Sequence, residues 1–229
     1  MDEIKNYMSR FTSVFDNLTP EEMEAHDAEI AKREAEQEKL ERAERFKNSG
    51  VPERYQLESL DTYRADTDEQ KKALNSARGF AQAVKCGAFK SLVYLGNAGI
   101  GKTHLACAIV RECGGKYRTA PDIVEELRRA KSFTAHETEE EIVNYYGRVS
   151  LLVIDEIGRG INATDEKYTL YQVLNARYNS RKPTVLISNF NKADFLQYVG
   201  VAAADRLVES ANILEINGTS YRQTLRGTK

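Results

Sequence analysis

A glycine-rich segment, residues 96–103, has the pattern G-x-x-x-x-G-K-T, whose residue types bind phosphate groups. It follows the apolar run Ser91–Leu95, so a strand is expected to end and a helix to begin at this loop. Backbone N–H groups and the positive end of the helix dipole then face an anion. We expect Lys102 to reach the β- and γ-phosphates of ATP or ADP, and the Thr103 hydroxyl to bind Mg²⁺. The expected nucleotide-binding loop consists of Gly96, Asn97, Ala98, Gly99, Ile100, Gly101, Lys102, Thr103 and His104.

Two alternatives to this interpretation follow from the same residues. A pattern of this kind can also be a flexible glycine loop before a helix. His104, which follows Thr103 directly, can equally be a packed or hydrogen-bonded residue of that helix.

A second apolar run, Val149–Glu156, ends in two acidic residues and supplies the other half of the expected site. Continuous apolar character is typical of a strand buried on both faces of a parallel sheet, and ligands bind at the carboxyl ends of such strands. We expect Asp155 to hold the Mg²⁺ shell and Glu156 to polarise the water that attacks the γ-phosphate. A further strand, Pro183–Asn189, brings Asn189 to the same edge, where it can hydrogen-bond that water. The pair indicates ATP hydrolysis, although four aliphatic residues before Asp-Glu could also be a plain buried strand.

The elements that must position these residues form an α/β pattern. Helical spacing alternates with short apolar runs from residue 67 onward, which predicts a three-layer αβα core with a central five-stranded parallel sheet. The expected strands are residues 91–95, 116–119, 149–156, 183–189 and 212–216. We expect no C-terminal helical lid after the last strand.

The amino-terminal part differs in composition from the rest. Apolar residues three or four apart predict a short amphipathic helix within residues 1–17, and Thr19 is then the expected N-cap of a helix that runs to Lys47. This second helix is dominated by Glu, Lys, Arg and Ala, which is typical of a solvated spacer and also suits an arm that docks on another protein, and we expect it to be both. The turn residues 48–52 mark the expected boundary between an arm, 1–50, and an ATPase domain, 51–229.

Composition excludes some classes of protein. The formal net charge of −2 neither favours nor excludes nucleic-acid binding. No apolar run is long enough for a membrane span, and the start lacks the apolar core of a secretory signal. The three cysteines form no C-x-x-C pair, so we expect reduced thiols in a cytoplasmic protein without a zinc site.

Several motifs occur together in one order and carry a family resemblance. They are GNAGIGKTHLA from Gly96, LLVIDEIG from Leu151, RKPTVLISN from Arg181, DRL from Asp205 and SYR from Ser220. The set resembles the AAA+ ATPases, and within them the DnaC-type bacterial or phage replicative helicase loaders and the related IstB transposition helpers. The resemblance implies that Asn189 is sensor 1 and that Arg206 is an arginine finger reaching a neighbouring subunit's nucleotide. It also implies that Arg222 lies where a second sensor would contact the nucleotide.

Without this resemblance, Arg206 would be interpreted as a surface ion pair with Asp205 or Glu209. The resemblance further implies partners: a hexameric, DnaB-like replicative helicase bound through the arm, single-stranded DNA, and other copies of the ATPase domain. Stacking and phosphate contacts suit sequence-independent strand binding. The candidates for single-stranded DNA contact are Phe133, Tyr168, Arg128, Arg129 and Lys131.

The basic cluster among these candidates can also be a charged, solvated helix end. Two other functions remain open at the sequence level. One is an accessory ATPase of a transposase that binds duplex DNA, and the other is an adaptor that holds nucleotide without hydrolysing it. Glu156 argues against the adaptor, because an adaptor needs no residue to activate water.

Overall fold

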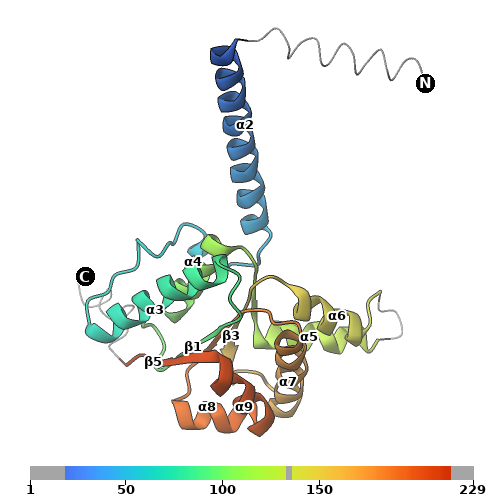
Figure 1. Ribbon diagram of the computed structural model, residues 1–229. Coiled ribbons are helices and arrows are strands. Elements are labelled where there is room, and N and C mark those ends of the chain that lie inside the picture. Colours follow the sequence, from blue (N-terminus) through green and yellow to red (C-terminus); the bar gives the residue numbers. More distant parts are fainter. Residues whose placement is uncertain (1–18, 133–135, 218–229) are drawn as a thin grey trace. The chain divides into compact units, whose positions relative to one another are not determined.

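The computed structural model describes residues 19–132 and 136–217 (Figure 1). By their internal contacts, residues fall into two compact units, the first ending at Glu44 and the second beginning at Arg45. The amphipathic helix expected within residues 1–17, the stacking candidate Phe133 and the second-sensor candidate Arg222 lie outside the described residues. Among the described helices, none is both long and apolar enough to cross a membrane.

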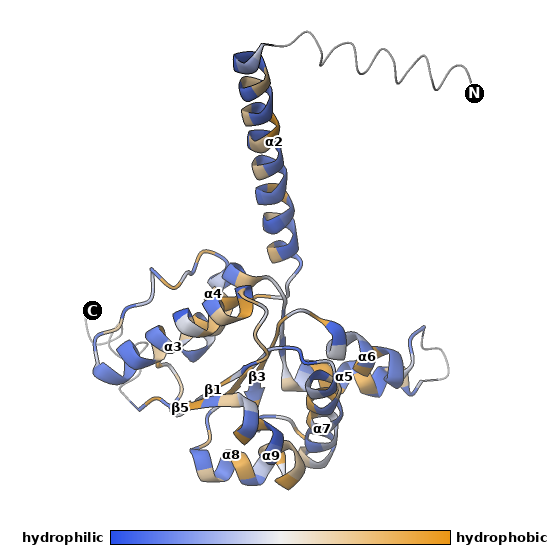
Figure 2. Ribbon diagram, viewed as in Figure 1, coloured by the Kyte–Doolittle hydropathy of each residue, from blue (hydrophilic) through white to orange (hydrophobic). Residues whose placement is uncertain are grey.

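Helix α2, Pro20–Lys47, begins as the sequence predicts. The Thr19 backbone N–H donates to the Glu22 carboxylate at 2.8 Å, and the Glu22 N–H donates to the Thr19 hydroxyl at 3.3 Å, which is a capping box. No residue of α2 is buried, and Figure 2 shows it as largely hydrophilic. The helix therefore has no apolar stripe that could build a core of its own.

The second unit is built on a five-stranded sheet in which every neighbouring pair of strands is parallel. Its strands, in chain order, are β1 Ser91–Leu95, β2 Lys116–Thr119, β3 Leu152–Ile157, β4 Thr184–Ser188 and β5 Ala211–Glu215. Their spatial order is β2-β3-β4-β1-β5. All residues of β1 and β4 are buried, which explains why these strands are apolar without alternation.

Helices cover both faces of this sheet, so the three-layer α/β prediction is confirmed. Two of them, α3 and α4, pack with one face of the strands in one apolar cluster, and α5 to α9 pack with the other face in a second (Figure 1). The helices are α3 Asp68–Lys85, α4 Lys102–Cys113, α5 Ala120–Ala130, α6 Glu139–Arg148, α7 Ala163–Asn179, α8 Lys192–Val199 and α9 Val201–Ser210, with a short 3₁₀ helix, η1, at Glu53–Tyr55. Capping boxes start three of them, at Thr67, Thr119 and Thr138.

Arg177 is the largest side chain that is almost fully buried, with 1% exposed, although helical spacing alone does not mark it as a core residue. Its guanidinium donates to the backbone carbonyls of Tyr146, Val149 and Pro183, and to the hydroxyl of Thr184. Burial lowers the pKa of Arg177 to about 9, so the group still carries its charge at neutral pH. It ties the end of α6 and the start of β4 to α7.

The segment just before Val51 belongs to the second unit. Ser49 is buried, and its carbonyl accepts a hydrogen bond from the Tyr117 N–H at 2.8 Å, while Lys116 Nζ donates to the Asn48 carbonyl at 2.7 Å. Phe46 packs against the apolar core. Since β2 lies at one edge of the sheet, this segment covers part of an edge that would otherwise present unpaired backbone groups.

Candidate nucleotide-binding site

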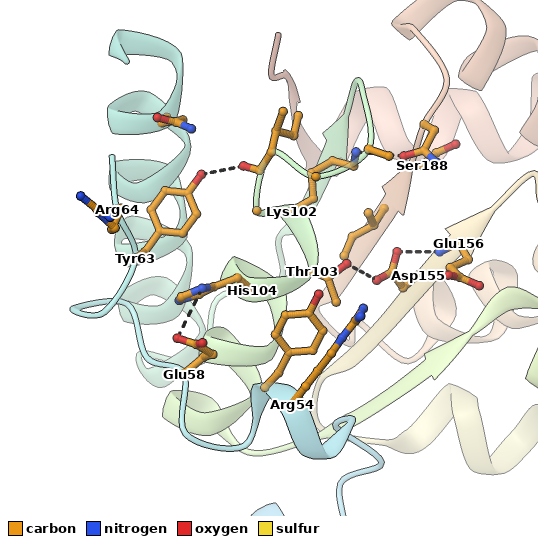
Figure 3. A pocket seen from close by; sticks show the side chains of 18 of the residues that line it. Arg54, Glu58, Tyr63, Arg64, Lys102, Thr103, His104, Asp155, Glu156 and Ser188 are labelled. Carbon is orange, nitrogen blue, oxygen red and sulfur yellow. Dashed lines mark hydrogen bonds and ion pairs between the residues drawn. The ribbon is translucent and has the colours of Figure 1, made fainter. Parts of the chain in front are cut away.

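A cavity of about 540 Å³ lies at the carboxyl edge of the sheet (Figure 3). Its walls come from three regions that the sequence analysis singled out: the glycine-rich loop, the end of β3 and the end of β4. A fourth wall, from residues 54–70, was not expected. The lining includes Ala98–His104, Asp155, Glu156, Arg159, Ile187–Asn189, and from the fourth wall Arg54, Tyr55, Glu58, Thr62, Tyr63, Arg64, Asp66 and Gln70.

The glycine-rich loop needs glycine for two different close approaches. Gly96 has φ +112°, and a Cβ atom there would lie 2.1 Å from the carbonyl oxygen of Ile216. Gly101 has φ +91°, and a Cβ atom there would lie 2.5 Å from the ring of Tyr63. The hydroxyl of Tyr63 donates to the Ile100 carbonyl at 3.0 Å. Burial raises the pKa of Tyr63 to about 12, so at neutral pH the phenol remains a donor that fixes the loop from outside.

Lys102 lies at the start of α4 and is only 5% exposed. Its Nζ donates to the carbonyls of Gly96 and Asn97 at 2.6 and 2.7 Å, and to Asn189 Oδ1 at 3.0 Å. Burial lowers the pKa of Lys102 to about 8, against the opposing effect of the Asp155 carboxylate. All three partners are neutral oxygens. A phosphate would therefore give this ammonium an anionic hydrogen-bond acceptor, which it lacks among the described residues.

The Asp155 carboxylate is 4% exposed and accepts three hydrogen bonds. The Thr103 hydroxyl donates to Oδ2 at 2.7 Å, and the Glu156 N–H donates to Oδ1 at 2.6 Å (Figure 3). The Tyr117 hydroxyl donates to Oδ2 at 2.8 Å. The sequence analysis missed Tyr117. In the parallel register Tyr117 pairs with Val153, so its side chain shares a face with Asp155, and that register cannot be read from the sequence.

The paired oxygens of Thr103 and Asp155 fit Mg²⁺, a hard cation that keeps several water ligands and takes others from phosphate groups. In the described part of the chain, no cluster of three or more His, Cys, Asp or Glu side chains could hold a metal alone. The donor set therefore suits an ion that arrives with a nucleotide rather than one held by the protein alone.

Glu156 occupies a strained position at the end of β3. Its φ of +58° is unusual for a residue other than glycine, and the pairing of β3 with β4 is irregular between Ile154 and Ile157. The irregularity turns the Glu156 side chain out of the strand pattern, where it is exposed and lines the cavity. Bulges that re-aim a side chain are frequent beside active sites.

His104 also lines the cavity, but its ring nitrogens face protein atoms. Nε2 lies 2.9 Å from the Ser59 carbonyl oxygen, and Nδ1 lies 3.5 Å from the Glu58 carboxylate. The ring also meets that of Tyr63 edge to face. These contacts are those of a packed helix residue that holds the fourth wall against α4, and contact with a nucleotide stays a prediction.

Arg206, on α9, does not line the cavity of its own chain. Its guanidinium lies over the rings of Tyr171 and Tyr178, at 5.8 and 5.5 Å from their centroids. Nη1 is buried and has no hydrogen-bond partner among the described residues, and none of the ion pairs found there joins Arg206 to Asp205 or Glu209. The surface-pair alternative is therefore not what the side chain does, and a role at a neighbouring subunit stays a prediction.

The basic residues proposed for DNA contact are paired with carboxylates. Arg128, Arg129 and Lys131 each form at least one ion pair, at 3.1 to 3.6 Å. Tyr168 is exposed on α7. The acidic partners are Glu125, Asp165 and Glu139. This arrangement matches the charged, solvated helix end that was the alternative interpretation, and DNA contact stays a prediction.

Comparison with known proteins places this site in a family. Residues 14–228 match the family model described as IstB-like ATP binding protein. The chain belongs to this IstB-like ATP-binding family. It is 31% identical over 188 residues to the replicative helicase loader DnaC of Escherichia coli K12, covering 80% of this chain and 76% of that protein. The chain is thus a member of the DnaC/IstB-like group of AAA+ proteins, and the assignment of its nucleotide site to the glycine-rich loop, Asp155 and Glu156 stays a prediction.

Two further relatives of the family show its range. An ATP-binding protein of insertion sequence IS232 from Bacillus thuringiensis is 31% identical over 144 residues, which cover 58% of this chain and 56% of that protein. The crystal structure of the DnaC helicase loader matches the fold with a TM-score of 0.64 at 23% identity, covering 72% of this chain and all of that one. The family therefore includes proteins of replication and of transposable elements.

Nucleotide binding should be accompanied by proton uptake at mildly alkaline pH. With a pKa of about 8 in the free protein, Lys102 is largely neutral at about pH 8.5, and a polyphosphate raises that pKa by charge attraction. Calorimetry of ADP binding at about pH 8.5 in buffers of different ionisation enthalpy should show uptake of a substantial fraction of a proton, which falls toward zero near pH 6.5. Lys102→Arg, which stays charged, should abolish the uptake; uptake equal to the parent's would rule out Lys102 as its source.

Tyr117→Phe should lower the affinity for Mg²⁺, so a higher Mg²⁺ concentration should be needed to support nucleotide binding. The substitution removes one of three hydrogen bonds to Asp155, and loss of such outer contacts costs about 10-fold in metal affinity. The matched control is Tyr146→Phe, which removes a buried tyrosine–carboxylate bond to Glu126 away from the cavity. Titration of Mg²⁺ at fixed ATP should shift for the first variant and not for the second. Equal shifts would mean that Tyr117 acts only through stability.

Proposed function

We propose that this protein is an ATP-dependent loader that delivers a hexameric, DnaB-like replicative helicase onto single-stranded DNA. The observation that carries the proposal is the convergence of Lys102, Asn189 and the Thr103–Asp155 pair on one cavity. It occurs in a chain that is 31% identical to a replicative helicase loader over most of both lengths. A nucleotide-dependent switch is what such a loader requires.

The proposed chemistry assigns one task to each residue of the cavity. Lys102 exchanges its carbonyl partners for the β- and γ-phosphates, and Thr103 with Asp155 binds Mg²⁺, which neutralises phosphate charge. Glu156 accepts a proton from the attacking water, and Asn189 orients that water. Arg206 stabilises the transition state in the neighbouring subunit, which couples hydrolysis to self-association. The ATPase activity serves as a switch, so a low turnover suffices.

The proposed arm acts separately from this chemistry. Helix α2 belongs largely to a unit of its own, exposes all of its described side chains except the half-buried Phe46 near its end, and carries many charges of both signs. A long solvated helix of this kind stabilises no core of its own, and such a helix is suited to binding another protein. We assign helicase binding to the arm, which comprises residues 1–50, and nucleotide binding and self-association to the rest of the chain.

A second candidate is an ATPase helper of a transposase that binds duplex DNA. It is favoured by the IstB-like family model and by the relative from insertion sequence IS232. That relative matches a smaller share of this chain than the helicase loader does, 58% against 80%. The loader is therefore the better supported of the two candidates.

Glu156→Gln should leave ATP binding intact and stop turnover. The amide cannot accept the proton of the attacking water, and loss of a general base costs about 100-fold or more in rate. The measurements are the dissociation constant for ATP and the rate of phosphate release. Glu69→Gln, the same chemical change on the exposed side of α3, should behave as the parent protein. Hydrolysis at the parental rate in Glu156→Gln would show that another residue is the base.

Removal of residues 1–44 should abolish helicase binding and preserve nucleotide binding. The truncation follows the division between the two units, so it keeps Phe46 and Ser49 in their contacts with the second unit. Size-exclusion chromatography with light scattering, on each form mixed with a replicative helicase hexamer of the same host, should show a complex only for the full chain. A complex with the truncated chain would contradict the arm assignment. ATP-dependent assembly on duplex DNA without any helicase complex would favour the transposase helper.

A further inference from the structure

A buried carboxylate holds the turn that follows β3. Glu166, in the first turn of α7, is 0% exposed. Its Oε1 accepts the Gly158 N–H at 2.6 Å, and its Oε2 accepts the Gly160 N–H at 2.7 Å. Burial, together with the nearby Glu166 carboxylate, raises the pKa of the Tyr198 phenol, so the two side chains lie close together. No ion pair to Glu166 is found in the described part of the chain, and the two backbone N–H groups are its hydrogen-bond donors there.

The same turn is restricted by close packing. Gly158 has φ +88°, and a Cβ atom there would lie 2.3 Å from the ring of Phe190. A Cβ atom on Gly160 would lie 2.2 Å from the buried carboxylate. The Arg159 N–H donates to the Glu156 carbonyl at 3.1 Å. The turn is therefore fixed at both glycines, and the one side chain that it carries between them is that of Arg159.

Arg159 faces the nucleotide cavity together with Lys102 and Asn189. It is exposed to solvent, and no ion pair to it is found within residues 19–132 and 136–217. Its charge disfavours the protonated form of Lys102 and contributes to the lowered pKa of that group, so the two cations lie within electrostatic reach. Two like charges directed at one cavity repel each other, and an anion bound between them would relieve that repulsion. No role for Arg159 was predicted from the sequence.

We propose that Arg159 is a phosphate-binding residue for the terminal phosphate of ATP, and that Glu166 is the positioning residue that holds it there. This inference rests on the proposed nucleotide-driven function of the same site. The guanidinium fork matches the oxygens of a phosphate group and can bind two of them at once. Arg159 lies three residues after Glu156, the proposed base, and both residues line the same cavity. It therefore distinguishes ATP from ADP within one chain, whereas Arg206 acts on a neighbouring chain.

The test compares two nucleotides on the full-length protein by titration calorimetry in the presence of Mg²⁺. Arg159→Ala should weaken binding of a non-hydrolysable ATP analogue about 10-fold or more, the value of a charged hydrogen bond, and change ADP binding by less than about 2-fold. Arg159→Lys should recover part of the loss. The matched control is Arg148→Ala, which removes an exposed arginine of α6 that does not line the cavity. Equal losses for both nucleotides, or no loss for the analogue, would overturn the assignment.

Glu166 is tested through its dependence on Arg159. An amide at this position can accept only through its one oxygen, so Glu166→Gln should release one end of the turn and reduce the preference for the ATP analogue. In the Arg159→Ala background the same substitution should change that preference no further. A further reduction there would show that Glu166 acts on the site by another route. If Glu166→Gln fails to fold, Tyr198→Phe, which removes the phenol hydroxyl near the carboxylate, replaces it and should reduce the preference partially.

Nucleotide binding by the parent protein distinguishes a failure of the proposed function from a failure of the Arg159 assignment alone. A parent protein that binds neither nucleotide would overturn the proposed function and this inference together. A parent protein that binds both, with an Arg159→Ala variant that retains the parental preference, would overturn the inference alone.

Discussion

A buried ammonium group must be surrounded by oxygen atoms, and in this protein that requirement falls on Lys102. The oxygens come from the loop after β1 and from Asn189 after β4, which can meet only because those two strands are neighbours in the sheet. Strand β3, on the other side of β4, adds Asp155 at the same edge. The site therefore depends on the order of the strands. That order is in turn stabilised by the apolar layers on both faces of the sheet.

Features encoded by neighbouring residues could be predicted from the sequence. The apolar strands, the Thr19 cap and the glycine-rich loop between a strand and a helix are local patterns, and the structure confirms each of them. Buried polar residues that belong to no motif could not be predicted, because their partners come from elsewhere in the chain. Glu166 satisfies a turn of the β3–α7 loop, Arg177 caps the end of one helix and the start of a strand, and Tyr117 reaches Asp155 only through the strand register. Each is a polar residue whose burial depends on the tertiary fold.

The positions of basic side chains could be predicted from the sequence, but whether each one is already paired with a carboxylate could not. The spacing that identified Arg128, Arg129 and Lys131 gave no information about the carboxylates that neutralise them. Arg206 is the contrasting case, because two tyrosine rings hold its guanidinium while one of its nitrogens lacks a partner. A cation held by aromatic faces remains able to accept a stronger, anionic partner. Basic side chains that are equivalent in composition therefore differ in the structure, because some are paired with carboxylates and one is held by aromatic rings.

Tyr117 connects two parts of the second unit that are far apart in the sequence. Its backbone N–H holds Ser49, at the point where the chain leaves α2, and its phenol holds the carboxylate of Asp155. The connecting segment and the Asp155 carboxylate are thus joined by two hydrogen bonds to one residue, and the ring of that residue is packed in the apolar core. Because both hydrogen bonds depend on the placement of Tyr117 in that core, the position of the connecting segment and that of the carboxylate are fixed together.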